Sequence, residues 1–230
     1  MGATVNIIAI ETATAACAVG VRTSGGVEVT RVVDEHRRHT ESLMPGVAGL
    51  LEECGLTARD IERVVVDRGP GLFTGLRVGI ATASSLAQAL GCGIVGVTSL
   101  ELLAHGARDA GVRGTLVSAV DGRRGEVFVQ TFRLGDSVEP VGPPEVARPR
   151  NVVIEWATNG APVTFSGDGV GRYCSDFDAV PNGTVFAQSV PSVHAALALG
   201  GSRGPGDTIS PLYLREADAV ANFSTRERSP

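Results

Sequence analysis

The spacing of apolar and polar residues predicts a sheet interleaved with helices in the first hundred residues. Short apolar runs at 5–10, 15–22 and 27–34, separated by polar turns, predict three consecutive strands joined as a meander. From Thr40 the apolar spacing becomes helical, which predicts a helix over 40–54 with Thr40 as its N-cap. The apolar residues that share one face of this helix are Leu43, Val47, Leu50, Leu51 and Cys54.

The pattern then alternates between short buried strands and helices. Residues 61–66 and 94–97 are apolar runs of strand length, whereas 74–90 and 99–110 have helical spacing. Ser99 is the expected cap of the second of these helices. The predicted order of the first half is therefore β-β-β-α-β-α-β-α.

The second half repeats this order in a weaker form, because two predicted strands again flank a polar turn. The expected elements are strands at 116–120, 126–133, 162–166 and 212–214, and helices near 151–158 and 192–199. We therefore expect a duplicated α/β fold with a first lobe at 1–102 and a smaller second lobe at 103–230. The polar composition from about residue 215 predicts a frayed tail.

Composition narrows the classes of function. The chain has 230 residues, 43% of them hydrophobic, with a net charge of −5, and all 20 basic residues are arginine. Without lysine, P-loop kinase and Schiff-base chemistry are excluded, and the acidic balance disfavours a broad nucleic-acid-binding face. The four cysteines are scattered, and no apolar run reaches the ~20 residues needed to span a bilayer. We expect a cytoplasmic protein that does not contact a membrane.

The histidines give little support for a metal centre. His36 and His39 are only three residues apart, and His105 and His194 are isolated. A zinc site needs three or four converging ligands. The sequence therefore predicts no metal site, and it contains no convincing nucleophile–base pair for catalysis.

A strip of small residues recurs every fourth position on the helix at 74–90, which would let another helix approach closely. Two interpretations remain open: these surfaces pack within the lobe, or parts of both helices form an exposed apolar patch for a partner. The residues predicted for a partner interface are Leu43, Val47, Leu50, Leu51, Gly75, Gly79 and Ala83.

Four segments together resemble the TsaB (YeaZ) family in order and spacing, over nearly all of the chain. They are Glu11-Thr12-Ala13-Thr14, GPGLFTGLRVG at 69–79, DGRRGEVF at 121–128 and PLYLR at 211–215. The segment at 69–79 is the most specific of the four. The resemblance implies the ASKHA fold (actin-like ATPase, sugar kinase, Hsp70), with two ribonuclease-H-like lobes. It also supports the partner interface, because members of this family pair through these two helices.

The resemblance further implies a role in forming N6-threonylcarbamoyladenosine at position 37 of tRNA. In that family TsaB is a non-catalytic subunit that pairs with its metal-bearing paralogue TsaD and works with the ATPase TsaE. We therefore expect no cofactor on this chain, ATP and a metal ion on partner subunits, tRNA contacts through the complex, and a homodimer when the partner is absent. The rival functions are an M22-type metallopeptidase, a small ASKHA kinase and an autonomous RNA-binding module.

Glycines after two of the predicted strands suggest a degenerate nucleotide cradle, since such glycines bring backbone amides close to an anion. A turn without a ligand explains them equally well. Glu11 stands where a kinase of this superfamily would place a phosphate-side acid, although hydrogen bonding at the strand end is the simpler role. The residues predicted for the cradle are Glu11, Thr12, Gly69, Gly71, Thr74, Gly167 and Gly169.

Overall fold

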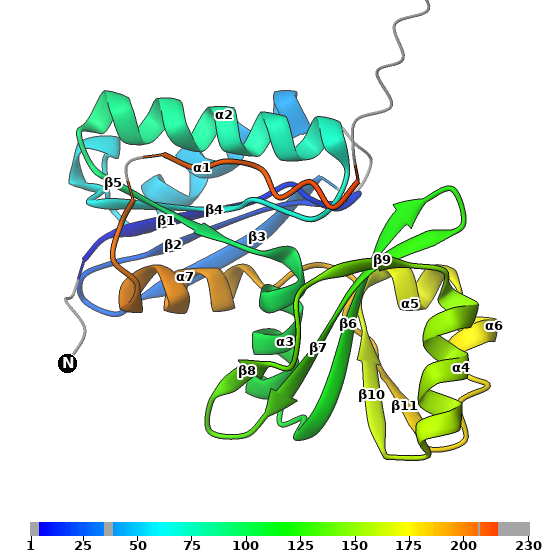
Figure 1. Cartoon of the computed structure of the whole chain (residues 1–230). Coiled ribbons are helices and arrows are strands. Elements are labelled where there is room, and N and C mark those ends of the chain that lie inside the picture. The colour runs from blue at the N-terminus through cyan, green and yellow to red at the C-terminus, as the bar shows by residue number, and fades with distance from the viewer. Residues whose placement is uncertain (1–4, 35–38, 207, 216–230) are drawn as a thin grey trace, which may run out of the picture.

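Two mixed sheets with helices packed on them form two lobes (Figure 1). The computed structural model describes residues 5–34, 39–206 and 208–215. In these ranges no helix is long and apolar enough to cross a membrane. The expected α/β class is confirmed, and the strand order of the sheets shows how the two lobes are related.

The first sheet has the order β3-β2-β1-β4-β5. Strands β1 (Ile7–Glu11), β2 (Cys17–Arg22) and β3 (Glu28–Asp34) form the expected antiparallel meander. Strands β4 (Arg63–Asp67) and β5 (Gly93–Val97) add to β1 in parallel. The central strand β1 is buried along its whole length, because helices cover both faces of the sheet.

The second sheet repeats that order as β8-β7-β6-β10-β11. Strands β6 (Gly114–Arg123), β7 (Glu126–Leu134) and β8 (Val138–Pro140) are antiparallel, and β9 (Glu145–Ala147) also pairs with β7. Strands β10 (Val163–Ser166) and β11 (Gly183–Phe186) continue from β6 in parallel. The same sequence of strand directions in both sheets confirms the duplicated two-lobe fold.

Helices α1 (His39–Glu53) and α2 (Phe73–Leu90) cover one face of the first sheet. Helix α1 begins at His39, so Thr40 lies inside its first turn and is not the N-cap that the sequence suggested. Helix α2 ends at Gly91, whose φ of 64° is the left-handed conformation that glycine adopts most readily. On the second sheet, α4 (Pro149–Asn159), α5 (Asp168–Arg172) and α6 (Cys174–Phe177) pack on one face.

The remaining face of each sheet is covered by a helix from the other half of the chain. Helix α3 (Ser99–Asp109) buries Leu100 and Leu103 against β6 and β7 of the second sheet. Helix α7 (Val193–Ser202) buries Ala196 and Leu197 against β1 and β4 of the first. The boundary expected at residue 102 falls inside α3, whereas α7 belongs wholly to the second half and covers the first sheet.

The structure differs from the sequence prediction mainly in short elements. The helices α5 and α6 and the short strands β8, β9 and β11 were not expected. The strand expected at 212–214 is absent: that segment joins no sheet and bends at Leu214. The cap of α3 is Thr98, whose hydroxyl accepts from the Glu101 backbone N–H at 3.2 Å. Ser99, the expected cap, has a different role described below.

Candidate functional site

Two carboxyl groups end the central parallel strands of the first lobe. Glu11 is the last residue of β1 and Asp67 the last of β4, and both side chains are fully buried. Glu11 Oε1 accepts hydrogen bonds from the backbone N–H groups of Ala13 at 2.7 Å and Thr14 at 3.3 Å. The hydrogen bonding expected for Glu11 at the strand end is therefore confirmed.

Asp67 is held in the same manner. Its Oδ1 accepts from the Gly69 backbone N–H at 2.8 Å and from the Ser99 hydroxyl at 2.9 Å. In each carboxyl group the second oxygen, Glu11 Oε2 or Asp67 Oδ2, is buried with no hydrogen-bond partner among the residues that the structure describes. An unpaired buried carboxylate oxygen is costly, so both groups favour the protonated state.

Burial raises the pKa values of these acids. The pKa of Glu11 is well above its ordinary value, first because of burial and then because of the neighbouring charges of Asp67 and Asp168. Burial also raises the pKa of Asp67 to about 7, against the opposing effect of its hydrogen bonds from Gly69 and Ser99. The pair therefore holds protons near neutral pH instead of two full negative charges.

The second lobe contributes a matching pair of acids at its own strand ends. Asp168, the first residue of α5, accepts from the backbone N–H of Asp121 at 2.9 Å, and burial raises its pKa to about 6. Asp121 forms ion pairs with Arg123 at 3.0 Å and with Arg172 at 3.5 Å. Asp168 also contributes to the raised pKa of Glu11, so the charges of acids from the two lobes interact across the lobe junction.

The glycines of the expected cradle are required by contacts between backbones. A Cβ atom at Gly71 would lie 2.2 Å from the carbonyl oxygen of Ala13, and one at Gly167 would lie 2.1 Å from that of Ala119. Gly169 is similarly close to Ala119, and Gly69 has a φ of 99°, which disfavours any other residue. The loop after the parallel strand thus packs on the turn that follows β1 in the first lobe and on β6 itself in the second.

The other cradle residues are divided between the interior and the surface. Thr12 is buried and donates its hydroxyl to the Gly75 carbonyl at 2.9 Å, which fixes α2 on β1. Thr74 is exposed in the first turn of α2. Glu11, Asp67 and Asp168 interact electrostatically at this site, so its buried polar side chains are acids and not the basic groups that would attract a phosphate. The nucleotide cradle stays a prediction, with the turn explanation now supported for its glycines.

The described residues do not form a metal centre. No group of three histidine, cysteine, aspartate or glutamate side chains in the described ranges is placed to hold a metal ion. The pair that prompted the metal question, His36 and His39, is not covered, because residue 36 and the side chain of residue 39 lie outside what the structure describes.

The seven residues predicted for a partner interface need a correction. All seven are buried, and the side chains among them are at most 7% exposed, within the core between α1, α2 and the first sheet. A Cβ at Gly79 would lie 2.1 Å from Thr12 Oγ1, so the small-residue strip fits α2 against β1. Of the two interpretations that the sequence left open, packing within the lobe is the one that the structure supports for these side chains.

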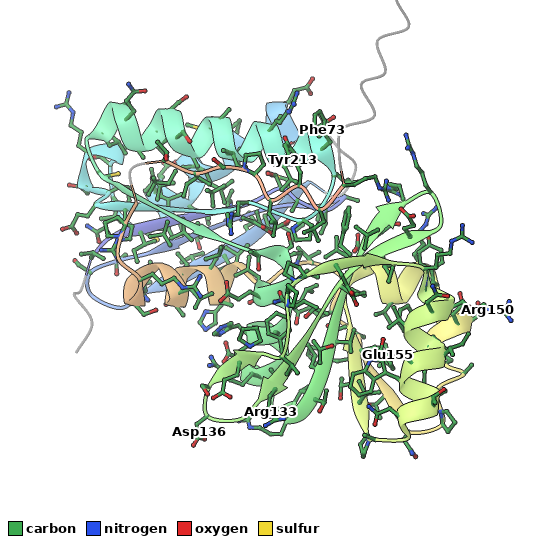
Figure 2. The ribbon with its side chains drawn as sticks, viewed as in Figure 1. Phe73, Arg133, Asp136, Arg150, Glu155 and Tyr213 are labelled. Carbon is green, nitrogen blue, oxygen red and sulfur yellow. The ribbon has the colours of Figure 1, made fainter. Side chains whose placement is uncertain are left out.

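The outward faces of the same helices present other residues. On α1, Met44 is 46% exposed, and on α2, Phe73 is 44% exposed. Figure 2 shows Phe73 next to Tyr213 of the carboxyl-terminal segment, at the start of α2. These exposed apolar side chains lie outside the regular apolar spacing of the two helices. The helical spacing therefore identified the face that packs on the core and not the outward face.

Three acids of the junction were absent from the predicted site. Asp67 directly follows the apolar run Val64-Val65-Val66, and Asp121 follows Ala119-Val120. Asp168 follows the strand β10 by two residues. A carboxylate at the end of each buried strand was the signal that would have identified them.

Comparisons with known proteins place this fold and site in one class. A family model described as "TsaD: tRNA N6-adenosine threonylcarbamoyltransferase" matches residues 24–198, so the chain belongs to this class of proteins. The chain is 34% identical over 163 residues to "tRNA threonylcarbamoyladenosine biosynthesis protein TsaB" of Escherichia coli, covering 67% of this chain and 70% of that protein.

A second TsaB extends the match to almost the whole chain. The protein of the same description from Bacillus subtilis is 28% identical over 228 residues, covering 94% of this chain and 97% of that one. A crystal structure from Pseudomonas aeruginosa, described as similar to the peptidase YeaZ, has a TM-score of 0.81 and 29% identity, covering 92% of this chain and all of that one. The chain belongs to the TsaB (YeaZ) family, as its four sequence segments indicated.

Proposed function

We propose that this chain acts in the formation of N6-threonylcarbamoyladenosine in tRNA, as a non-catalytic subunit that pairs with a TsaD-type partner. The observation that carries the proposal is the match to TsaB over 94% of the chain and 97% of the Bacillus subtilis protein. In the proposed complex, ATP and a metal ion are bound by partner subunits, a TsaE-type ATPase takes part, and tRNA is contacted through the assembly in the cytoplasm.

The arrangement of acids supports a subunit without catalytic chemistry of its own. Glu11 and Asp67 each use one oxygen to fix the backbone of their own lobe, and their raised pKa values reduce the negative charge that would hold a cation. The described residues contain no metal-binding group of three, which weighs against the metallopeptidase suggested by the peptidase name of the Pseudomonas structure.

The partner surface of this proposal lies on the outward faces of α1 and α2. Met44, Phe73 and Ala81 are exposed there, while the neighbouring Val47 and Gly79 are buried in the core. Aromatic residues, methionine and arginine are enriched in the centres of protein interfaces. We therefore propose that the partner contacts these exposed residues and not the buried residues that the sequence predicted on the same two helices.

Reconstitution tests the proposed function directly. The chain is combined with purified TsaD-type and TsaE-type proteins, the threonylcarbamoyl-adenylate donor, ATP and tRNA, and modified adenosine is measured by mass spectrometry. We expect modification only when this chain is present, and neither modification nor peptide cleavage by the chain alone. Turnover by the chain alone that is abolished by a chelator would contradict the non-catalytic assignment.

A pair of matched variants tests the partner surface. Met44→Glu places a charge on the outward face of α1, and Val141→Glu places one on a similarly exposed residue, 56% exposed, of the second lobe. We expect Met44→Glu to weaken binding to the TsaD-type protein by about tenfold, equivalent to ~1.4 kcal/mol, and Val141→Glu to leave it unchanged. If calorimetry gave equal affinities for the two variants, and their melting temperatures were also equal, the interface would have to lie elsewhere.

A further inference from the structure

The carboxyl-terminal segment crosses from the first lobe to the second within four residues. We call Leu212–Arg215 the latch segment; it belongs to the red stretch that runs alongside α2 in Figure 1. At its start, the Leu212 backbone N–H donates to the carbonyl of Arg68 at 2.7 Å. This bond attaches the segment to the loop that follows β4, next to Asp67.

Tyr213 attaches the latch segment to the first turn of α2. Its ring lies 5.4 Å from that of Phe73, centroid to centroid, and its hydroxyl accepts from Arg77 Nε at 3.2 Å. The Arg77 guanidinium in turn covers the Phe73 ring at 3.7 Å. Figure 2 shows Phe73 and Tyr213 lying against each other at this point. The three side chains make one stacked contact between the segment and the first lobe.

The next two residues attach the segment to the second lobe. Leu214 packs against the core cluster that contains Leu100 of α3 and Phe128 of β7. The guanidinium of Arg215 forms an ion pair with Glu126, the first residue of β7, and lies 5.9 Å from the centroid of the Phe128 ring. Consecutive side chains therefore hold opposite sides of the lobe junction.

The turn that presents Glu126 has an unusual backbone. Arg123 and Arg124 have φ values of 61° and 56°, a region that residues other than glycine seldom adopt. The backbone N–H of Arg123 donates to Asp121 at 2.9 Å, which holds the turn in this shape. Positive-φ residues persist only where surrounding contacts determine them, so contacts within the second lobe help to hold the turn that presents Glu126 to Arg215.

We propose that Leu212–Arg215 is an interlobe latch that sets the separation of the two lobes at their junction. Its two anchors are the start of α2 and the β6–β7 turn, which are parts of the GPGLFTGLRVG and DGRRGEVF segments. The latch therefore links three of the four sequence segments that characterise the chain. Release of either anchor loosens both lobes: the lobe that the anchor contacts and the lobe on the other side of the junction.

Hydrogen exchange on the full chain tests this coupling, because each anchor residue contacts one lobe only. In Arg215→Ala, which loses a second-lobe contact, we expect amide exchange in the first-lobe peptide 68–78 to become roughly threefold faster. In Tyr213→Ala, which loses a first-lobe contact, we expect the same in the second-lobe peptide 119–128. Arg133→Ala is the matched control, because Arg133 is an exposed arginine of β7 far from the latch (Figure 2).

A charge exchange separates the latch from general damage to the fold. Glu126→Arg and Arg215→Glu each break the ion pair, and the double variant restores it with the charges reversed, so exchange in peptide 68–78 should return toward that of the parent chain. Faster exchange confined to the lobe that each substitution touches would overturn the proposal. Failure of the double variant to restore slow exchange would also overturn it.

Discussion

The hydroxyl of Ser99 donates a 2.9 Å hydrogen bond to the buried carboxylate of Asp67. Asp67 ends β4 of the first sheet, whereas Ser99 begins the helix α3 that covers the second sheet. The backbone N–H of Ser99 also donates to the Gly69 carbonyl at 3.0 Å. One residue thus joins the parallel strand of the first lobe to the covering helix of the second, next to the buried acid pair.

Removal of this hydroxyl should destabilise the chain. In Ser99→Ala, Asp67 loses one of the bonds that lower its pKa, while its Oδ1 keeps the hydrogen bond from the Gly69 backbone N–H. We expect the free energy of unfolding in urea to fall by about 1–3 kcal/mol, with the larger loss at pH 8, where the carboxylate is ionised. The matched control is Ser118→Ala, since the Ser118 hydroxyl is buried with no hydrogen-bond partner among the described residues and its removal should cost little. Equal losses for the two variants would contradict the importance of the Asp67 bond.

The buried acids should make the chain less stable as the pH rises. A carboxyl group whose pKa is raised by folding stabilises the folded state fully below its unfolded pKa, and that contribution is lost as the pH rises through the folded pKa. For Asp168 and Asp67 the window runs from about 4 to about 6 and about 7, respectively. We expect melting temperatures to fall across this window and then to level off.

Amide substitutions identify the groups responsible for this dependence. Asp67→Asn cannot ionise and keeps an oxygen that accepts from Gly69 and Ser99. The pH dependence of its free energy of unfolding between pH 4 and 7 should therefore be smaller, by up to about 1.4 kcal/mol for each unit of pKa shift that is lost. The variant should also be more stable than the parent chain at pH 8. The exposed Asp136 provides the control, because Asp136→Asn should leave the curve unchanged. If the stability of Asp67→Asn changed with pH as steeply as that of the parent chain, other groups would be responsible for the pH dependence.

Gly79, in the small-residue strip on α2, should tolerate no side chain. In Gly79→Ala the new Cβ would lie 2.1 Å from Thr12 Oγ1, so α2 must move away from β1. We expect a loss of about 1–3 kcal/mol from overpacking, measured by urea denaturation. Gly171→Ala is the control, because Gly171 lies in α5 with open space around its Cβ position, and alanine there should be neutral or slightly stabilising.

The contact of α7 with the first sheet gives a parallel test of the helix exchange. A Cβ at Gly200 would lie 2.2 Å from Val65 Cγ2, so Gly200→Ala should push α7 off β4. We expect the same order of destabilisation, about 1–3 kcal/mol, with faster amide exchange in β1 and β4. If exchange changed only within α7, the helix would not be a structural part of the first lobe.

The repeating order of strands could be predicted because each central strand is a buried apolar run bounded by polar turns. The missed strand β8 has only three residues, two of them exposed, so it lacks the alternation that reveals a strand. The strand predicted at 212–214 is wrong although the segment is a short apolar run. Leu214 packs on the second lobe while Tyr213 contacts the first, so these apolar residues are buried by crossing the junction and not by joining a sheet.

Which surface an apolar helix face covers could not be predicted. Leu43 and Val47 were correctly placed on one face of a helix, but the periodicity does not say whether a sheet or a partner lies opposite. The same limit applies to α3, whose leucines pack on the distant second sheet. The acid pair of Glu11 and Asp67 depends on the parallel pairing of β1 with β4, a contact between residues far apart in the chain.

The exchange of α3 and α7 has a consequence for the order of events as the chain emerges from the ribosome. The strands of the first sheet are complete once β5 has been made, but one of their apolar faces waits for α7, which ends at Ser202. Ile7, Ala9 and Val65 therefore stay without their cover until nearly all of the second lobe has been synthesised. A nascent chain stalled after β11 carries an open hydrophobic sheet, and it is at this stage that chaperone binding and aggregation compete with folding.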